Sequence, residues 1–150
     1  MEFFKYKDLV YEIIGAAMKV HSELGWGLLE PIYNEALHIE LLERGIISES
    51  EKKVQCYYKN YALEKYYMVD MMVGDIILEL KSVGDLTSAH RAQLFNYLRL
   101  TKKPFGILIN FGEKSLQSER YGYVEETNEC VLLDKEMNII NPNYCINDNV

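Results

Sequence analysis

Two stretches near the N-terminus repeat apolar residues at helical spacing. In residues 7–24 the repeated positions are Leu9, Ile13, Ala16, Ala17 and Val20. In residues 30–44 they are Ile32, Ala36, Ile39 and Leu42, together with Tyr33, Leu37 and Leu41. Pro31 suits the first turn of a helix, and a glycine often follows the last turn. The pattern predicts a first helix that ends at Gly25 or Gly27. It also predicts a second helix with a broad apolar face that ends at Gly45.

After Gly45 the period changes to that of strands. Residues 52–58 alternate polar and apolar side chains, which indicates a half-buried strand. Lys59 and Asn60 could turn this strand into a long one over residues 61–73. Gly74 and Asp75 follow, and glycine at the first central position is typical of a type II′ hairpin turn. The return strand is expected over residues 76–81.

The second half of the chain contains a third helix and a buried strand. Residues 87–103 predict a helix with Thr87 or Ser88 as its N-cap. Pro104 stops it, and the apolar run 105–111 suits the middle of a sheet. Residues 120–134 could form a further hairpin, and residues 141–150 resemble an irregular tail. The element order predicts one α/β or α+β domain over residues 1–150, with a mixed sheet flanked by helices.

The two-residue turn determines which residues of the hairpin oppose each other. If Val73 faces Ile76, then Asp70 falls opposite Glu79. Alternation gives one wholly apolar face, formed by Val69, Met71, Val73, Ile76, Leu78 and Leu80. Asp70, Glu79 and Lys81 share the other face. Two like charges across a strand pair destabilise the sheet, so a nearby group must offset their repulsion.

Two explanations fit this arrangement. The simpler one is a surface-facing strand on which Asp70 or Glu79 pairs weakly with Lys81. The other is a divalent cation, since Mg²⁺ favours a few carboxylate oxygens together with water and phosphate. Such an ion polarises a phosphate and generates a nucleophile from water. The apolar neighbours of the two acids favour the cation.

Charge is distributed unevenly along the chain. The net charge is −7, which argues against a protein that binds nucleic acid through an overall basic surface. Residues 51–110, however, hold 9 basic and 6 acidic residues, whereas both flanking regions are acidic. The middle of the chain is therefore where a phosphate backbone could approach.

Other features place the chain in a broad class. The first residues lack the pattern of a signal peptide, and no apolar run approaches roughly 18 residues, so no membrane span is expected. Cys56, Cys130 and Cys145 are far apart, which suits reduced thiols in the cytoplasm better than disulfides or a zinc site.

The hairpin acids and a second motif resemble a known superfamily. An Asp, a hairpin and then Glu-x-Lys resembles the PD-(D/E)xK nucleases, although Val69 stands where their name has Pro. The stretch "GLLEPIYNEAL" is similar to the GxxExxY pattern of a small bacterial and archaeal family in that superfamily, with Gly27, Glu30 and Tyr33 at the named positions. The resemblance covers about residues 8–112. It does not explain the acidic extension over residues 113–150.

The resemblance implies a restriction-endonuclease-like core and a set of site residues. The implied metal ligands are Asp70, Glu79, Glu30 and the carbonyl of Leu80. The implied catalytic residues are Lys81, Glu30, Gln93 and Tyr97. The i, i+4 spacing of Gln93 and Tyr97 puts both on one helix face.

The implied function is a Mg²⁺-dependent nuclease or phosphodiesterase that acts on DNA, with Mn²⁺ as a substitute ion and RNA as an alternative substrate. A homodimer fits as well, because small nucleases of this kind often pair to cut two strands. The alternative is an inactive module that keeps the fold and binds or regulates without cutting. An enzyme for small phosphorylated substrates is disfavoured, because no phosphate-binding glycine-rich loop is present.

Several candidates also have simpler explanations. An acid such as Glu30 is favoured at a helix start by the helix dipole alone. Tyr33 and Tyr97 are expected mainly in packing, Gln93 suits the surface as well as the site, and His90 is expected as a solvated helix residue. Packing is also the default role for a cluster of strand tyrosines, which are Tyr57, Tyr58, Tyr61, Tyr66 and Tyr67.

Overall fold

We describe the protein from a computed structural model, in which residues 3–141 are described. The helices are η1 (Phe4–Tyr6, a 3-10 helix), α1 (Lys7–Leu24), α2 (Glu30–Glu43) and α3 (Ser88–Thr101). The strands are β1 (Glu49–Tyr58), β2 (Tyr61–Val73), β3 (Ile76–Lys81), β4 (Phe105–Asn110), β5 (Gln117–Val124), β6 (Glu129–Leu133) and β7 (Ile139–Asn141). The predicted helices and strands are therefore present. The expected irregular tail lies outside the described residues from position 142 onward.

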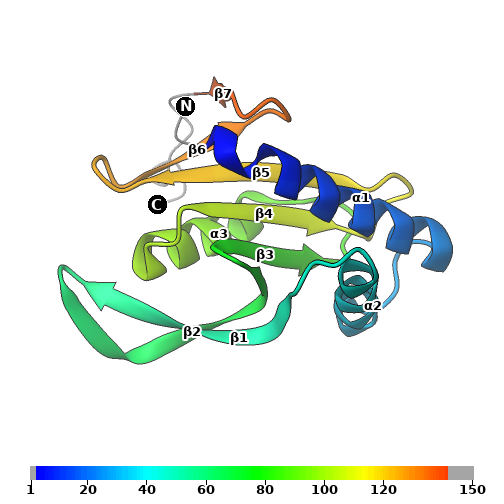
Figure 1. Ribbon diagram of the computed structural model, residues 1–150, viewed down its shortest axis with the longest axis horizontal. Coiled ribbons are helices and arrows are strands. Elements are labelled where there is room, and N and C mark those ends of the chain that lie inside the picture. Colours follow the sequence, from blue (N-terminus) through cyan, green and yellow to red (C-terminus); the bar gives the residue numbers. More distant parts are fainter. Residues whose placement is uncertain (1–2, 142–150) are drawn as a thin grey trace.

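The seven strands of the described residues form one mixed sheet in the order β1 to β7 (Figure 1). Within residues 3–141, only β3 and β4 pair in parallel, because α3 connects them by crossing over one face of the sheet. The other neighbours are antiparallel. This is an α+β fold with a mixed sheet, as the element order predicted.

The sheet separates two apolar clusters. Residues of α1 and α2 pack on one face, and residues of α3 pack on the other. β4 shows the alternation, since Ile107 and Ile109 join the first cluster and Leu108 joins the second. Within residues 3–141, none of the helices combines the length and apolar character needed to cross a membrane.

The β2–β3 hairpin has the predicted register. Gly74 has a φ of 56°, which suits the first central residue of a type II′ turn. Val73 pairs with Ile76, and the ladder ends two residues further at Met71 and Leu78. The predicted position of Val69 was wrong, because this side chain packs in the cluster on the α3 side. β2 leaves β3 beyond Met71, so the hairpin alternation no longer decides its face.

The apolar face of α2 is narrower than predicted. Tyr33, Leu37 and Leu41 are fully buried. Three residues expected on the same face are instead 43–60% exposed, namely Ile32, Ile39 and Leu42. The reason is geometric, because Tyr33, Leu37 and Leu41 stand at i, i+4, i+8 spacing and form a narrow stripe that faces the core.

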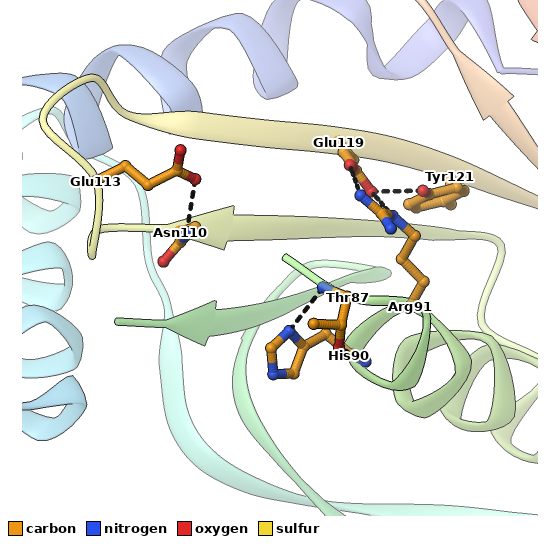
Figure 2. Close-up of polar contacts among 7 residues, drawn as sticks. All are labelled: Thr87, His90, Arg91, Asn110, Glu113, Glu119 and Tyr121. Atoms are coloured by element: carbon orange, nitrogen blue, oxygen red, sulfur yellow. Dashed lines mark hydrogen bonds and ion pairs between the residues drawn. The ribbon is translucent and has the colours of Figure 1, made fainter. Parts of the chain in front are cut away.

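The acidic C-terminal region adds strands to the main sheet. β5 and β6 form the expected hairpin, and residues 117–122 of β5 pair with the whole of β4. Arg91 of α3 donates two 2.7 Å hydrogen bonds to the Glu119 carboxylate of β5 (Figure 2). The hydroxyl of Tyr121 donates a third bond of 2.6 Å to the same group. These bonds join α3 to β5.

Candidate active site

Where β2 and β3 separate, hydrogen bonds between side chains and backbone take the place of the backbone hydrogen bonds that join the two strands. The backbone N–H of Asp70 donates to Oε1 of Glu79 at 3.2 Å. The backbone N–H of Leu80 donates to Oδ2 of Asp70 at 2.8 Å. Each carboxylate therefore accepts a bond from the opposite strand, and the two acids lie next to each other across the end of the hairpin.

Glu79 is buried beside this like charge. It is only 3% exposed, and burial followed by the negative charge of Asp70 raises the pKa of Glu79 to about 9. Lys81 opposes the shift more weakly. Without an added positive charge, Glu79 is therefore protonated at neutral pH.

Lys81 begins a chain of polar contacts that leads onto α3. Its Nζ donates to Oε1 of Gln93 at 2.9 Å, and Nε2 of Gln93 donates to the hydroxyl of Tyr97 at 3.1 Å. Burial, followed by the charges of Glu79 and Asp70, raises the pKa of Tyr97 to about 12. The tyrosine therefore stays neutral and holds the Gln93 amide with its oxygen toward the lysine.

A cavity of about 560 Å³ lies on the other side of this acid pair. Its lining residues are Glu30, Pro31, Asn34, Glu35, His38, Ser50, Glu51, Asp70 and Leu80. The structure thus divides the predicted site residues into two groups. Glu30, Asp70 and Leu80 border the cavity. Glu79 and the chain of Lys81, Gln93 and Tyr97 lie toward α3. Asp70 connects the two groups through its contact with Glu79.

Sequence reasoning missed several residues of this cavity, among them Asn34 and Glu51. Nδ2 of Asn34 donates to the backbone carbonyl of Asp70 at 3.0 Å. Asn34 lies one turn after Glu30 on α2, and this i, i+4 spacing was the available signal. Glu51 lies on β1, and no pattern in the sequence indicated it. Glu51 joins Glu30, Glu35 and Asp70 in the lining, and these four acids make the cavity strongly acidic.

Tyr33 explains how Glu30 reaches the cavity. Its hydroxyl accepts a hydrogen bond from the backbone N–H of Leu28 at 3.1 Å and donates one to the carbonyl of Gly25 at 2.7 Å. The buried ring thus holds the loop that enters α2. Tyr33 is a core residue, as expected, but its hydroxyl also sets the start of the helix that carries Glu30.

The same loop is joined to the ends of β3 and β4. Gly27 has a φ of 81° and donates its N–H to the carbonyl of Phe111 at 3.1 Å. The N–H of Phe111 in turn donates to the carbonyl of Lys81 at 2.8 Å. Buried Asn110 donates a 2.9 Å hydrogen bond to the Glu113 carboxylate at the same end of the sheet (Figure 2). The loop and the lysine are therefore fixed relative to each other.

His90 has a structural role that was not expected. The backbone N–H of Thr87 donates to its Nδ1 at 3.0 Å, and its own N–H donates to Oγ1 of Thr87 at 3.4 Å (Figure 2). This reciprocal pair is a capping box at the start of α3. Burial, followed by the positive charge of Lys81, lowers the pKa of His90, so the ring remains neutral and keeps Nδ1 as an acceptor.

The donor set suits a hard divalent cation. Among residues 3–141, no three His, Cys, Asp or Glu side chains are grouped so that they could hold a metal ion. Mg²⁺, however, is commonly bound by one or two carboxylates, with water and phosphate as the remaining ligands. Asp70 and Glu79 supply such a pair, and a cation would also offset the repulsion that raises the pKa of Glu79.

A mixed sheet with helices on both faces, and an acid pair beside a lysine where two central strands separate, defines a restriction-endonuclease-like fold. Residues 7–121 match the PD-(D/E)XK nuclease superfamily, and the chain belongs to this superfamily. The match extends beyond residue 112 into β5. Nucleases of this superfamily generally depend on divalent metal ions.

A solved structure supports the fold alone. The chain is similar to the protein titled "Crystal structure of SSO0001", with a TM-score of 0.51 and 17% sequence identity. The similarity covers 83% of this chain and 64% of that one, so the chain spans less than two thirds of its relative. No curated protein matches the sequence.

Proposed function

We propose that the protein is a metal-dependent nuclease that acts on DNA and that it belongs to the GxxExxY family within its superfamily. The observation that carries the proposal is the buried contact between Asp70 and Glu79 beside Lys81. Burying the carboxyl group of Glu79 beside the half-buried carboxylate of Asp70 is costly unless a positive charge compensates. A bound Mg²⁺ or Mn²⁺ ion meets this requirement and is used in phosphodiester hydrolysis.

The roles follow from the positions of the residues. Asp70 and Glu79 would hold the metal, with the carbonyl of Leu80, and Glu30 would approach it from the cavity side. When bound, the ion would supply a Lewis acid for the phosphate and lower the pKa of a water molecule. Glu30 would bind that water and orient it toward the phosphorus.

Lys81 would act on the substrate from the side of α3. Because Gln93 accepts a hydrogen bond from its ammonium group, the lysine is held in one place. Tyr97 fixes the orientation of the Gln93 amide. A positive charge placed in advance beside the phosphate stabilises the negative charge that develops in the transition state.

The test compares cleavage of single-stranded, duplex and branched DNA in Mg²⁺, in Mn²⁺ and in EDTA. We expect metal-dependent cleavage by the natural protein and its loss in Asp70→Asn and Glu79→Gln. Asp75→Asn is the matched control, because it makes the same chemical change in the exposed turn of the same hairpin. Undiminished cleavage by Glu79→Gln would refute the assignment.

An inactive binding or regulatory module is the second candidate. The acidic cavity and the lack of a group of three metal-binding side chains in residues 3–141 favour it. Calorimetric titration with Mn²⁺ separates the two candidates. Binding that disappears in Asp70→Asn supports the nuclease, and no specific binding by the natural protein supports the module.

Three broader proposals accompany this function. A single domain over residues 1–150 is supported by the single sheet that unites the seven strands described. A cytoplasmic location is supported by Cys56 and Cys130, which are buried thiols. A homodimer is supported by the exposed apolar side chains of α2, including Ile39 and Leu42. Light scattering during size-exclusion chromatography tests the last of these.

A further inference from the structure

The first hairpin extends beyond the rest of the sheet as a two-stranded ribbon. β2 has 13 residues, but only Met71, Met72 and Val73 pair with β3. The remaining part, Tyr61–Asp70, pairs with β1 alone, and Figure 1 shows the two strands running outward together. At roughly 3.3 Å per residue the ribbon is about 30 Å long. It therefore offers a long surface next to the candidate active site.

Tyrosines on this ribbon are exposed, although packing was the expected role. Tyr58, Tyr61 and Tyr66 are 63%, 72% and 49% exposed. Tyr57 and Tyr67 are half-buried, and the ring of Tyr67 packs against Tyr97 of α3 with a centroid distance of 4.6 Å. Tyr58 and Tyr61 pair across the two strands at the outer end of the ribbon, and Tyr66 lies further in, opposite Gln55. The ribbon therefore exposes aromatic rings at two places along its length.

The outer part of the same ribbon is basic. Residues 52–68 contain four lysines and one glutamate, whereas Glu49, Glu51 and Asp70 lie at its base, where Glu49 pairs with Lys52. Two of the lysines lie over exposed rings. Nζ of Lys53 is 4.8 Å from the ring centroid of Tyr66, and Nζ of Lys59 is 5.5 Å from that of Tyr58. Positive charge and aromatic surface are thus combined at the same places.

One face of the ribbon leads to the cavity. Glu51 and Asp70, which occupy neighbouring positions on β1 and β2, both line it. The next pair outward on this face is Lys53 with Met68, and the following pair includes Tyr66. Tyr66 and Met68 alternate with residues that pack toward α3, so they face the opposite way. A chain lying on this face would reach Asp70 directly.

We infer that the ribbon is a binding track for single-stranded nucleic acid that guides the strand to the acidic cavity. The inference rests on the proposed nuclease function, and it names the form of the substrate. Lysines along the track attract phosphates, which the acidic cavity alone would repel. Exposed tyrosines provide surfaces on which unpaired bases stack. Bases within a duplex are already stacked on each other, so the exposed rings favour a single strand.

The test measures binding without cleavage, in EDTA, by fluorescence anisotropy of a labelled single-stranded DNA oligonucleotide and of the matching duplex. A triple variant changes Tyr58, Tyr61 and Tyr66 to alanine. We expect it to bind the single strand at least about tenfold more weakly. The same three positions changed to phenylalanine keep the rings and should bind normally. Tyr11→Ala is the matched control, because Tyr11 is 74% exposed on α1, away from the ribbon.

A second variant removes charge rather than rings. Changing Lys53, Lys59 and Lys65 to glutamine should reduce the slope of log affinity against log salt concentration by about 2, since each phosphate contact with a single strand contributes about 0.7. Lys135→Gln, on the loop after β6, should leave the slope unchanged. Circular dichroism confirms that each variant is folded.

The outcomes distinguish this inference from the proposed function. Normal single-strand binding by the alanine variant, tighter binding of the duplex, or no binding by the natural protein would each overturn the track. If the natural protein cleaves DNA while the ribbon variants bind and cleave normally, the nuclease proposal stands and the track fails. If binding depends on the ribbon but no metal-dependent cleavage occurs, the track stands and the nuclease proposal fails.

Discussion

The hydroxyl of Tyr33 donates a 2.7 Å hydrogen bond to the carbonyl oxygen of Gly25, across the turn between α1 and α2. The hydroxyl oxygen of Tyr33 also accepts a hydrogen bond from the backbone N–H of Leu28. One buried side chain therefore satisfies a donor and an acceptor in the loop that precedes Glu30. The contact links a core residue to the position of a proposed catalytic acid.

Replacing Tyr33 with phenylalanine should loosen this loop without emptying the core. The ring remains, but two backbone groups lose their partner, so we expect the free energy of unfolding to fall by about 1–3 kcal/mol. Metal-dependent cleavage should fall as well under conditions where the variant is fully folded. Urea denaturation and the cleavage assay check the two effects. Tyr11→Phe, at an exposed position of α1, should change neither, and unaltered cleavage by Tyr33→Phe would show that the loop does not position Glu30.

The bidentate pair between Arg91 and Glu119 should make stability depend on pH in the acid range. Burial acts to raise the pKa of Glu119, but the hydrogen bonds from Arg91 and Tyr121 outweigh it and lower the pKa below its usual value. A lowered carboxyl pKa contributes stability that is present at neutral pH and is lost as pH falls through the folded-state value. Glu119→Gln should therefore be destabilised by about 1.5–3 kcal/mol at pH 7, and by progressively less toward pH 3.

Denaturant unfolding of both proteins between pH 3 and pH 7 measures this difference. Glu126→Gln, at an exposed position beyond β5, serves as the control and should follow the natural protein throughout. A gap between Glu119→Gln and the natural protein that stays constant across this range would contradict the assigned pKa direction.

The order and register of the central elements were predictable because local chemistry determines them. Gly74 fixes the turn, and the turn fixes the register that brings Asp70 near Glu79. Helix ends were predictable for the same reason, since Thr87 and Gly25 are cap residues whose effect is local. These features depend on a few neighbouring residues and not on the rest of the fold.

Features that depend on distant contacts were not predictable. The exposure of Ile39 on α2 follows from how narrowly that helix contacts the core, which no local pattern records. Glu51 reaches the cavity only because β1 lies beside β2 at that point. The exposed state of Tyr66 follows from the separation of β2 from β3, which leaves the outer part of the hairpin without a helix on that face. Each of these depends on the assembled sheet.

The cap at the start of α3 should tolerate one substitution at His90 and not another. Thr87→Ala removes the side-chain acceptor and should cost about 0.5–2 kcal/mol of stability. His90→Ala removes the reciprocal acceptor and should also destabilise. His90→Glu should preserve most of the stability, because a carboxylate at this position accepts the Thr87 N–H in the same way. Thermal unfolding followed by circular dichroism ranks the three, and equal losses for alanine and glutamate would exclude the reciprocal bond.

The raised pKa of Glu79 has a consequence for the protein without metal. A carboxyl group whose folded-state pKa lies above its unfolded value stabilises the fold at low pH, and this contribution is lost as pH rises through the folded-state value. For Glu79 the window extends from about 4.3, the usual value, to about 9. In EDTA, stability should therefore decline across this window, with a slope of at most about 1.4 kcal/mol per pH unit from this residue.

Glu79→Gln should remove this decline, because the amide keeps the shape of the protonated acid and never ionises. In EDTA at pH 8 the variant should therefore be more stable than the natural protein, whereas near pH 4 the two should be alike. Mg²⁺ should stabilise the natural protein most at high pH, since binding requires Glu79 to lose its proton, and should leave the variant almost unchanged. Urea denaturation with and without Mg²⁺ measures these differences, and Asp75→Asn should keep the slope of the natural protein. If the free energy of unfolding in EDTA fell with pH at the same rate in Glu79→Gln and in the natural protein, the carboxyl group of Glu79 would not have a raised pKa. No cation would then be needed to compensate its charge.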